Sequence, residues 1–157
     1  MLPIVINALA TSGLPANRLE LEITESVLMQ NTFATLSALH QLRELGVRIA
    51  MDDFGTGYSS LSYLRSFPFN KIKIDRSFIA DLSKNESSHA IVRAITGLAG
   101  DLNMTTTAEG VETEQQMQLA KALGCTEMQG FFFSQPKPLT QITREFFSRA
   151  RRAESAA

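Results

Sequence analysis

The sequence has no tryptophan, one cysteine (Cys125) and only two histidines among its 157 residues. A single cysteine cannot form an intrachain disulfide, which is typical of proteins from a reducing compartment, so we expect a cytoplasmic location. Cys125 has no histidine close to it in sequence and is interpreted as a packed thiol rather than a nucleophile. His40 and His89 lack the ligand spacing of a zinc site.

The sequence also lacks a strong excess of charge and any long apolar run. Its formal net charge is -1, which gives no electrostatic reason to expect a nucleic-acid polymer or an anionic membrane as a partner. No apolar run approaches the roughly 20 residues that span a bilayer, and no signal peptide is evident. The content of 44% hydrophobic and 20% charged residues is that of an ordinary globular domain with one core.

What the sequence does contain is a regular alternation of strand and helix patterns. Strands are expected at 19–24, 47–51, 71–75, 104–108 and 127–133. Helices are expected at 3–12, 32–45, 59–65, 77–82, 88–102, 113–123 and 139–149. This alternation predicts an α/β fold with a parallel sheet and crossover helices. Residues 1–149 then form one domain, and residues 150–157 a frayed tail.

The stretch around Asp52 and Asp53 stands out from this pattern. The two adjacent carboxylates end the mostly apolar strand at 47–51, and a loop containing Gly55-Thr56-Gly57 follows at once. Two acids at the end of a buried strand are costly to desolvate unless a cation meets them. A solvated turn or a helix cap is the plainer interpretation, but the buried strand favours a functional role.

Further polar residues lie within or just after the other strands. They are Glu22, Lys73, Glu109, Glu112 and Gln129. Because the carboxyl ends of parallel strands share one rim, these residues are expected to converge there with the two aspartates. Clustered carboxylates favour hard ions such as Mg²⁺ or Mn²⁺, and a pair of these ions is a common means of hydrolysing a phosphodiester.

Each of these residues also has a plainer interpretation. Glu22 suits the exposed face of an amphipathic strand, and Glu109 and Glu112 suit the start of a helix. Gln129 suits an interior amide that has its hydrogen bonds satisfied. Lys71 is interpreted as a surface lysine, yet it shares a strand face with Lys73, so periodicity alone does not choose between the two lysines.

Five motifs together resemble a known family, the EAL domains, which are bacterial phosphodiesterases that linearise cyclic di-GMP. In order they are Leu21-Glu22-Ile23-Thr24-Glu25-Ser26, Asp52-Asp53-Phe54-Gly55-Thr56-Gly57-Tyr58-Ser59-Ser60-Leu61, Lys71-Ile72-Lys73-Ile74-Asp75, Ala108-Glu109-Gly110-Val111-Glu112 and Gln129-Gly130-Phe131. The similarity extends to about Pro138. It implies a TIM-like (β/α)8 barrel with one antiparallel strand, and two-metal hydrolysis of cyclic di-GMP to linear pGpG.

The resemblance also implies a role for each matching residue. Glu22, Asp52, Asp53 and Glu109 resemble metal ligands, with Glu109 alternatively the general base. Lys73 and Gln129 resemble the residues beside the attacking water, which settles the choice between the two lysines. The remaining matches resemble supporting residues. Glu25 resembles the glutamate that anchors the loop formed by Phe54, Gly55, Thr56 and Gly57. Glu112 resembles a residue that supports the site from behind.

The departure from the family lies at the beginning of the chain. The Glu-Ala-Leu motif that names the family, and a later asparagine ligand, are absent, and five strand segments stand where the family barrel has eight. Open sheet edges then favour a homodimer or pairing with upstream domain segments. We expect impaired hydrolysis in this chain. The alternatives are a non-catalytic cyclic di-GMP-binding or protein-interaction module, and a part of a larger sensor protein.

Overall fold

The structure is a computed structural model that describes residues 2–24, 27, 32–55 and 61–144. It has an α/β architecture with five parallel strands in the order β1-β2-β3-β4-β5. The strands are β1 Glu20–Thr24, β2 Arg48–Phe54, β3 Lys71–Ile74, β4 Thr105–Ala108 and β5 Glu127–Met128. The predicted fold class is therefore confirmed, and β1 and β5 lie at the two ends of the described sheet.

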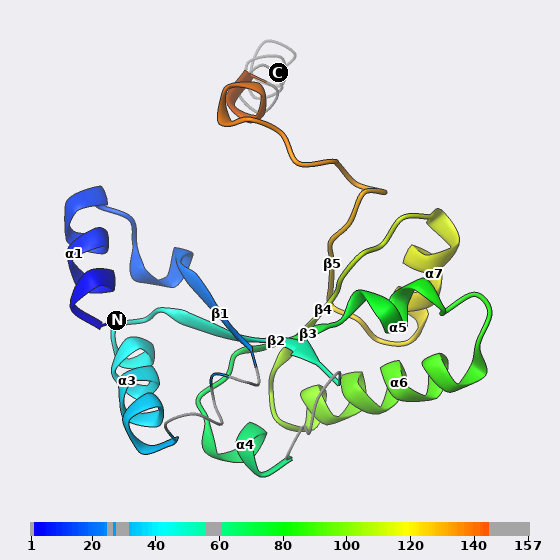
Figure 1. Cartoon of the computed structure of the whole chain (residues 1–157), viewed down its shortest axis with the longest axis horizontal. Coiled ribbons are helices and arrows are strands. Elements are labelled where there is room, and N and C mark those ends of the chain that lie inside the picture. Colours follow the sequence, from blue (N-terminus) through cyan, green and yellow to red (C-terminus); the bar gives the residue numbers. More distant parts are fainter. Residues whose placement is uncertain (1, 25–26, 28–31, 56–60, 145–157) are drawn as a thin grey trace, which may run out of the picture.

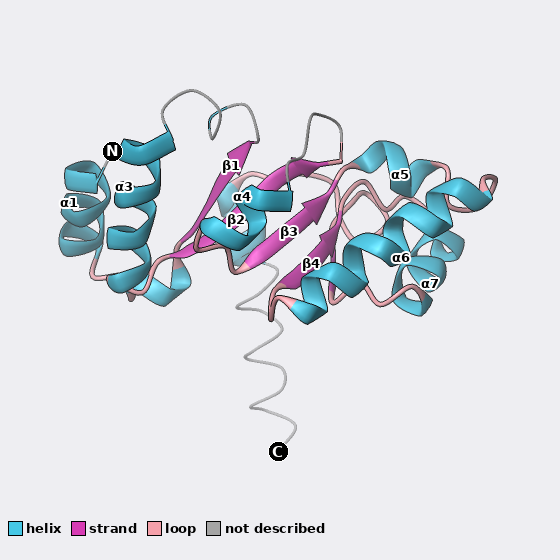
Figure 2. Ribbon diagram, turned by 90° about the horizontal axis from the view of Figure 1, so that it is seen from below, coloured by secondary structure: helices cyan, strands magenta, loops and turns pink. Residues whose placement is uncertain are grey.

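Helices separate the strands along the chain and cover one face of the sheet. They are α1 Leu2–Ser12, the short 3-10 helix η1 Ala16–Arg18, α3 Thr32–Glu44, α4 Leu61–Ser66, α5 Arg76–Ala80, α6 Glu86–Asp101 and α7 Glu114–Ala122. Figures 1 and 2 show α3, α4 and α6 on the same side of the sheet. A further helical segment covers 139–144. No helix among the described residues is long and apolar enough to cross a membrane.

Two helices begin at capping side chains. Thr113 accepts a hydrogen bond from the backbone of Gln116, and the Gln116 side chain bonds back to the backbone N–H of Thr113, which completes a capping box at α7. Asn85 caps α6 in the same sense by accepting a hydrogen bond from the N–H of Ser87. Local hydrogen bonding thus sets where these two helices begin.

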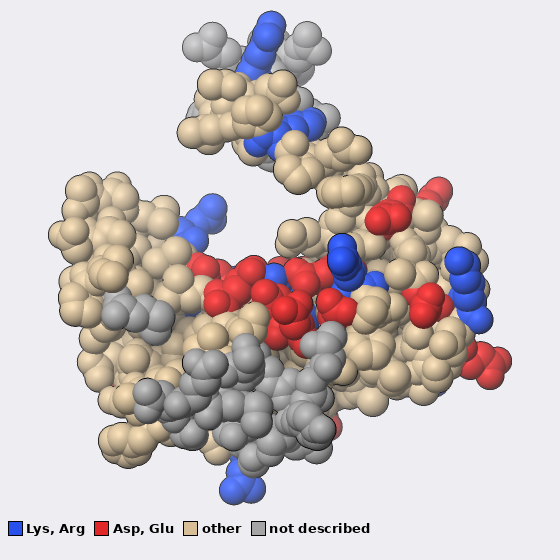
Figure 3. All heavy atoms as spheres, in the orientation of Figure 1, with Lys and Arg blue, Asp and Glu red and all other residues tan. Residues whose placement is uncertain are grey.

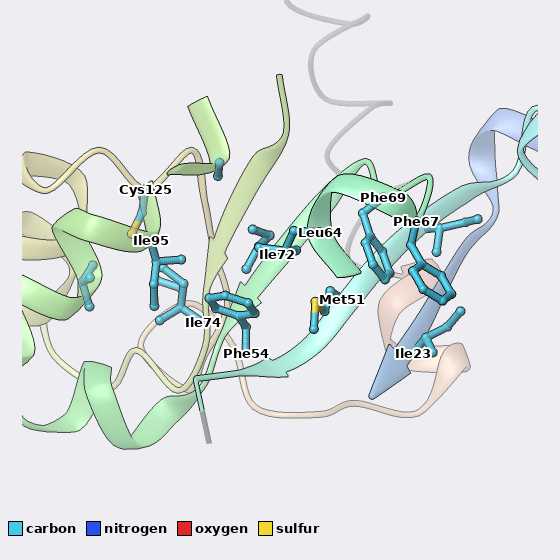
Figure 4. Close-up of a cluster of buried hydrophobic side chains, with 14 of the residues drawn as sticks. Ile23, Met51, Phe54, Leu64, Phe67, Phe69, Ile72, Ile74, Ile95 and Cys125 are labelled. Carbon is cyan, nitrogen blue, oxygen red and sulfur yellow. The ribbon is translucent and has the colours of Figure 1, made fainter. Parts of the chain in front are cut away.

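The hydrophobic core lies between the sheet and its helices. Ile49 of β2 and Ile72 and Ile74 of β3 are fully buried, and Met51 of β2 is nearly so. Figure 4 shows Met51, Ile72 and Ile74 among the buried side chains of this core. Burying one such side chain contributes about 1.5–3 kcal/mol. Cys125 belongs to the same core, as predicted for a packed thiol, and burial raises the pKa of its thiol to about 11.

The opposite face of the sheet, here called the inner face, carries charged side chains. Strand residues alternate between faces, so Lys71 and Lys73 of β3 point to the face opposite that of the buried Ile72 and Ile74. On β1 the corresponding positions are Glu20 and Glu22, which form ion pairs with these two lysines. The inner face is therefore polar along its length, and the fold directs its charges to one side of the sheet.

The last strand is shorter than predicted. β5 ends at Met128 instead of Phe133, because the backbone turns at Gly130. The N–H of Phe132 bonds to the carbonyl oxygen of Val111, and the N–H of Phe133 to that of Gly130. β2, by contrast, extends to Phe54, beyond its predicted end at residue 51.

We predict that Gly130→Ala destabilises the domain by about 2 kcal/mol, because a Cβ there would lie 2.1 Å from the Val111 carbonyl oxygen. The measurement is urea unfolding followed by circular dichroism. Gly97→Ala in α6 is the matched control, because a Cβ there meets nothing within 4 Å and should stabilise the helix. Equal stability of Gly130→Ala and the wild type would contradict the prediction.

Candidate functional site

Asp52 and Asp53 come together because β2 is irregular at its end. The register of β2 against β3 shifts between Met51 and Phe54, and Asp53 has a left-handed backbone with φ 54. In a regular strand two consecutive side chains would point to opposite faces. Here carboxylate oxygens of Asp52, Asp53 and Glu109 all lie within 4.8 Å of one another. Aspartate is one of the few residues that tolerates this conformation.

Lys73 lies at the centre of the predicted site and is buried. Its Nζ lies 2.8 Å from Glu22, 2.9 Å from Asp52 and 2.8 Å from Glu109. Burial lowers the pKa of Lys73, but hydrogen bonds to the three carboxylates outweigh it and raise the pKa above its ordinary value. The three donors of the charged ammonium therefore connect β1, β2 and the residue after β4.

The acidic cluster, defined as Glu22, Asp52, Asp53 and Glu109, carries more charge than Lys73 neutralises. Burial raises the pKa of Glu109, Lys73 opposes this, and the charges of Asp52 and Glu22 raise it further. In Figure 3 acidic side chains gather in a hollow along the middle of the molecule. Four carboxylates with one ammonium form an oxygen donor set that fits Mg²⁺ or Mn²⁺.

A pocket of about 510 Å³ adjoins the acidic cluster. Its lining includes the predicted residues Asp53, Glu109, Glu112 and Gln129. It also includes Asp75, Arg76, Gly110, Gly130 and Phe131, for which the sequence alone indicated no role. Each of these neighbours a residue in one of the motifs or belongs to a motif itself, and that adjacency was the available signal.

Backbone geometry holds two walls of this pocket close together. Gly110 has φ +69, and a Cβ there would lie 2.6 Å from the Cβ of Arg76. The N–H of Gln129 bonds to the Ala108 carbonyl, and the N–H of Val111 bonds to the Gln129 carbonyl. Gln129 is thereby fixed beside the turn that carries Glu109. Glu112 is exposed at the same pocket.

The loop residues are only partly within the described chain. Phe54 is buried, and Gly55 has φ +97 with Phe78 so close that a Cβ would lie 2.9 Å from its ring. Glu25, Thr56 and Gly57 lie outside the described residues, so their roles stay predictions.

The interpretation of Lys71 as a surface lysine was wrong. Lys71 is 7% exposed, and its Nζ lies 2.8 Å from Glu20 and 2.6 Å from Glu127. It points to the inner face of the sheet, as Lys73 does, and two acids satisfy its charge there. The repeated spacing in Glu20-x-Glu22, Lys71-x-Lys73 and Glu127-x-Gln129 was the sequence signal for this second set of charges.

Comparison with protein families gives one match, to the EAL domain, over residues 1–136. This chain belongs to the EAL domain family. The motifs that carried the resemblance in the sequence are thus those of a true family member. The five parallel strands are a part of the EAL TIM-barrel fold.

Two cyclic di-GMP phosphodiesterases are among the similar proteins. NbdA of Pseudomonas aeruginosa is 47% identical over 152 residues, which are 97% of this chain and 19% of that protein. The solved structure of the phosphodiesterase PaMucR in complex with c-di-GMP matches with a TM-score of 0.82 and 47% identity, covering 87% of this chain and 56% of that one.

A third relative was solved with metal. The manganese and c-di-GMP complex of BlrP1 from Klebsiella pneumoniae matches with a TM-score of 0.80 and 34% identity, over 85% of this chain and 34% of that one. The chain therefore spans about a fifth of NbdA and about half of the solved PaMucR chain.

We predict that Lys73→Met lowers the free energy of unfolding of the metal-free chain by about 3 kcal/mol, because it leaves three partly buried carboxylates without their cation. The folded state raises the pKa of Lys73, so its contribution is complete below pH 10.5 and is lost only as the pH rises through the higher folded value. Urea unfolding in EDTA at pH 7 measures the loss.

The control for this prediction is Lys84→Met, because Lys84 is exposed in the loop before α6. Adding Mn²⁺ should reduce the deficit of Lys73→Met, since the ion replaces part of the missing positive charge. A Lys73→Met variant as stable as the wild type in EDTA would show that the three ion pairs do not support the fold.

Proposed function

We propose that this chain carries most of the catalytic site of a cyclic di-GMP phosphodiesterase, which hydrolyses cyclic di-GMP to linear pGpG. The observation that carries the proposal is the acidic cluster around Lys73 beside a pocket of about 510 Å³. The names of two relatives, NbdA and PaMucR, support the same substrate and reaction.

Glu22, Asp52, Asp53 and Glu109 would hold two Mg²⁺ or Mn²⁺ ions. When bound, such ions supply a deprotonated water and stabilise charge on the phosphoryl oxygens. BlrP1, which was solved with manganese and c-di-GMP, supports this choice of metal. The surplus of carboxylates over Lys73 supports it independently, because the cluster repels itself in the absence of a further cation.

The protein side chains then have distinct tasks in the reaction. Glu109 has a raised pKa and lies in the pocket wall, so it suits the acceptance of a proton from the attacking water. Lys73 supplies a fixed positive charge for the water or the phosphate, and Gln129 orients the water. In the balanced reaction, the water oxygen bonds to phosphorus while the phosphorus–O3′ bond breaks, which leaves a 5′-phosphate and a free 3′-hydroxyl.

A second candidate function is binding of cyclic di-GMP without hydrolysis. The 157 residues include no Glu-Ala-Leu motif, whose glutamate the family resemblance implies as a metal ligand, so this stretch by itself would bind cyclic di-GMP and hydrolyse it slowly or not at all. Pairing with upstream domain segments, or with a second copy, would complete the site. The cytoplasmic location expected from the sequence belongs to the same proposal, since cyclic di-GMP signalling takes place there.

The test is to incubate the full chain with cyclic di-GMP and Mn²⁺ or Mg²⁺ and to resolve the products by chromatography. We expect slow, metal-dependent formation of pGpG that Glu109→Ala reduces by at least about 100-fold, the usual contribution of a general base. Glu44→Ala, an exposed change on α3, is the control and should leave the rate unchanged.

Two outcomes would contradict the proposal. Product formation that Glu109→Ala leaves intact would remove Glu109 from the reaction. Absence of both pGpG and cyclic di-GMP binding would exclude the substrate itself. Tight nucleotide binding with no turnover at any metal concentration would instead select the second candidate, a binding module.

A further inference from the structure

A second set of charges lies on the inner face of the sheet beside the acidic cluster. This lower network is defined as Glu20, Arg48, Lys71 and Glu127. Lys71 pairs with Glu20 at 2.8 Å and with Glu127 at 2.6 Å, and Arg48 pairs with Glu20 at 3.3 Å. The buried ammonium of Lys71 is its central group.

Lys71 connects strands that share no backbone hydrogen bonds with one another. It lies on β3, the central strand of the order β1-β2-β3-β4-β5, while Glu20 lies on β1 and Glu127 on β5. Each of those strands is separated from β3 by another strand. The Lys71 side chain therefore connects the central strand to both end strands of the described sheet, across the inner face.

The two sets of charges differ in balance. The lower network has two acids and two bases, so it is neutral, whereas the acidic cluster has four carboxylates for one ammonium. Repulsion within the acidic cluster acts to spread the strands that carry it. Lys73 opposes this between β1, β2 and the residue after β4, because its ion-pair partners are Glu22, Asp52 and Glu109, but one ammonium does not balance four carboxylates.

The lower network is placed to oppose that spreading. Glu22 follows Glu20 on β1 by two residues, and Gln129 is the first residue after β5, two residues beyond Glu127. Because strand residues two apart share a face, fixing Glu20 against Lys71 also fixes where Glu22 projects. Fixing Glu127 holds the strand from which Gln129 follows. Thr107 adds a hydrogen bond of 3.3 Å to the Glu127 carboxylate.

We propose that Lys71 is a positioning residue for the metal centre, acting through Glu20 and Glu127 to hold β1 and β5 in place before the ion binds. The inference rests on the proposed function for the identity of the metal site. Lys71 is not among the residues that line the pocket, and its ion-pair partners, Glu20 and Glu127, do not belong to the acidic cluster. It acts on the position of β1, the strand that also carries Glu22.

The experiment measures Mn²⁺ binding to the full chain by calorimetry and by the electron paramagnetic resonance spectrum of the bound ion, with no nucleotide present. Lys71→Met should weaken Mn²⁺ binding by about 10–100-fold, as is typical when a residue that orients metal ligands is lost. Lys71→Arg keeps the charge and should restore binding to within a few-fold. Lys121→Met, an exposed change on α7, is the matched control.

A second variant covers the case in which Lys71→Met fails to fold. Glu127→Gln removes one arm of the bridge at a side chain that is 45% exposed, and it should weaken Mn²⁺ binding several-fold in a folded chain. Unchanged Mn²⁺ affinity in folded Lys71→Met or in Glu127→Gln, even with lower thermal stability, would overturn the inference. Because the readout needs no cyclic di-GMP, a failure of the proposed function would be seen separately, in the hydrolysis assay.

Discussion

The ammonium of Lys73 is the interaction on which the rest of the site depends. The ammonium donates three hydrogen bonds, to the carboxylates of Glu22 on β1, Asp52 on β2 and Glu109 directly after β4. These segments are far apart in the sequence, so the cluster exists only when the sheet has formed. Without a central cation, the partial burial of these carboxylates would destabilise the fold. With Lys73 as its one cation, the cluster keeps a surplus of negative charge that can bind a divalent ion.

The separation of the two sheet faces makes such a charged interior tolerable. Ile72 and Ile74 pack beneath the helices, while Lys71 and Lys73, on the same strand, face the charges of β1. A slip of one residue in β3 would exchange these sets and bury two ammonium groups among apolar side chains. The charged face therefore contributes to register as well as to chemistry.

Much of the fold and of the site could be predicted from the sequence, because hydrophobic periodicity and the residues that end strands and helices are local features of the chain. The five strands, the helices between them and the convergence of Glu22, Asp52, Lys73 and Glu109 follow from alternation and from the parallel topology. The irregular end of β2 did not follow, because it depends on pairing with β3. Two other features depend on partners that are distant in the sequence. The burial of Lys71 depends on its ion pair with Glu127, and the early end of β5 depends on backbone hydrogen bonding to Val111.

Metal binding and the arrangement of the strands that carry the acidic cluster should therefore be linked in this domain. An ion that binds the acidic cluster removes repulsion between strands, and any interaction that already holds the strands together lowers the cost of forming its site. The neutral lower network provides such an interaction without competing for the ion, because its own charges are paired. A charge-balanced set beside a charge-deficient one is thus a physical means of preparing a cation site before the cation arrives.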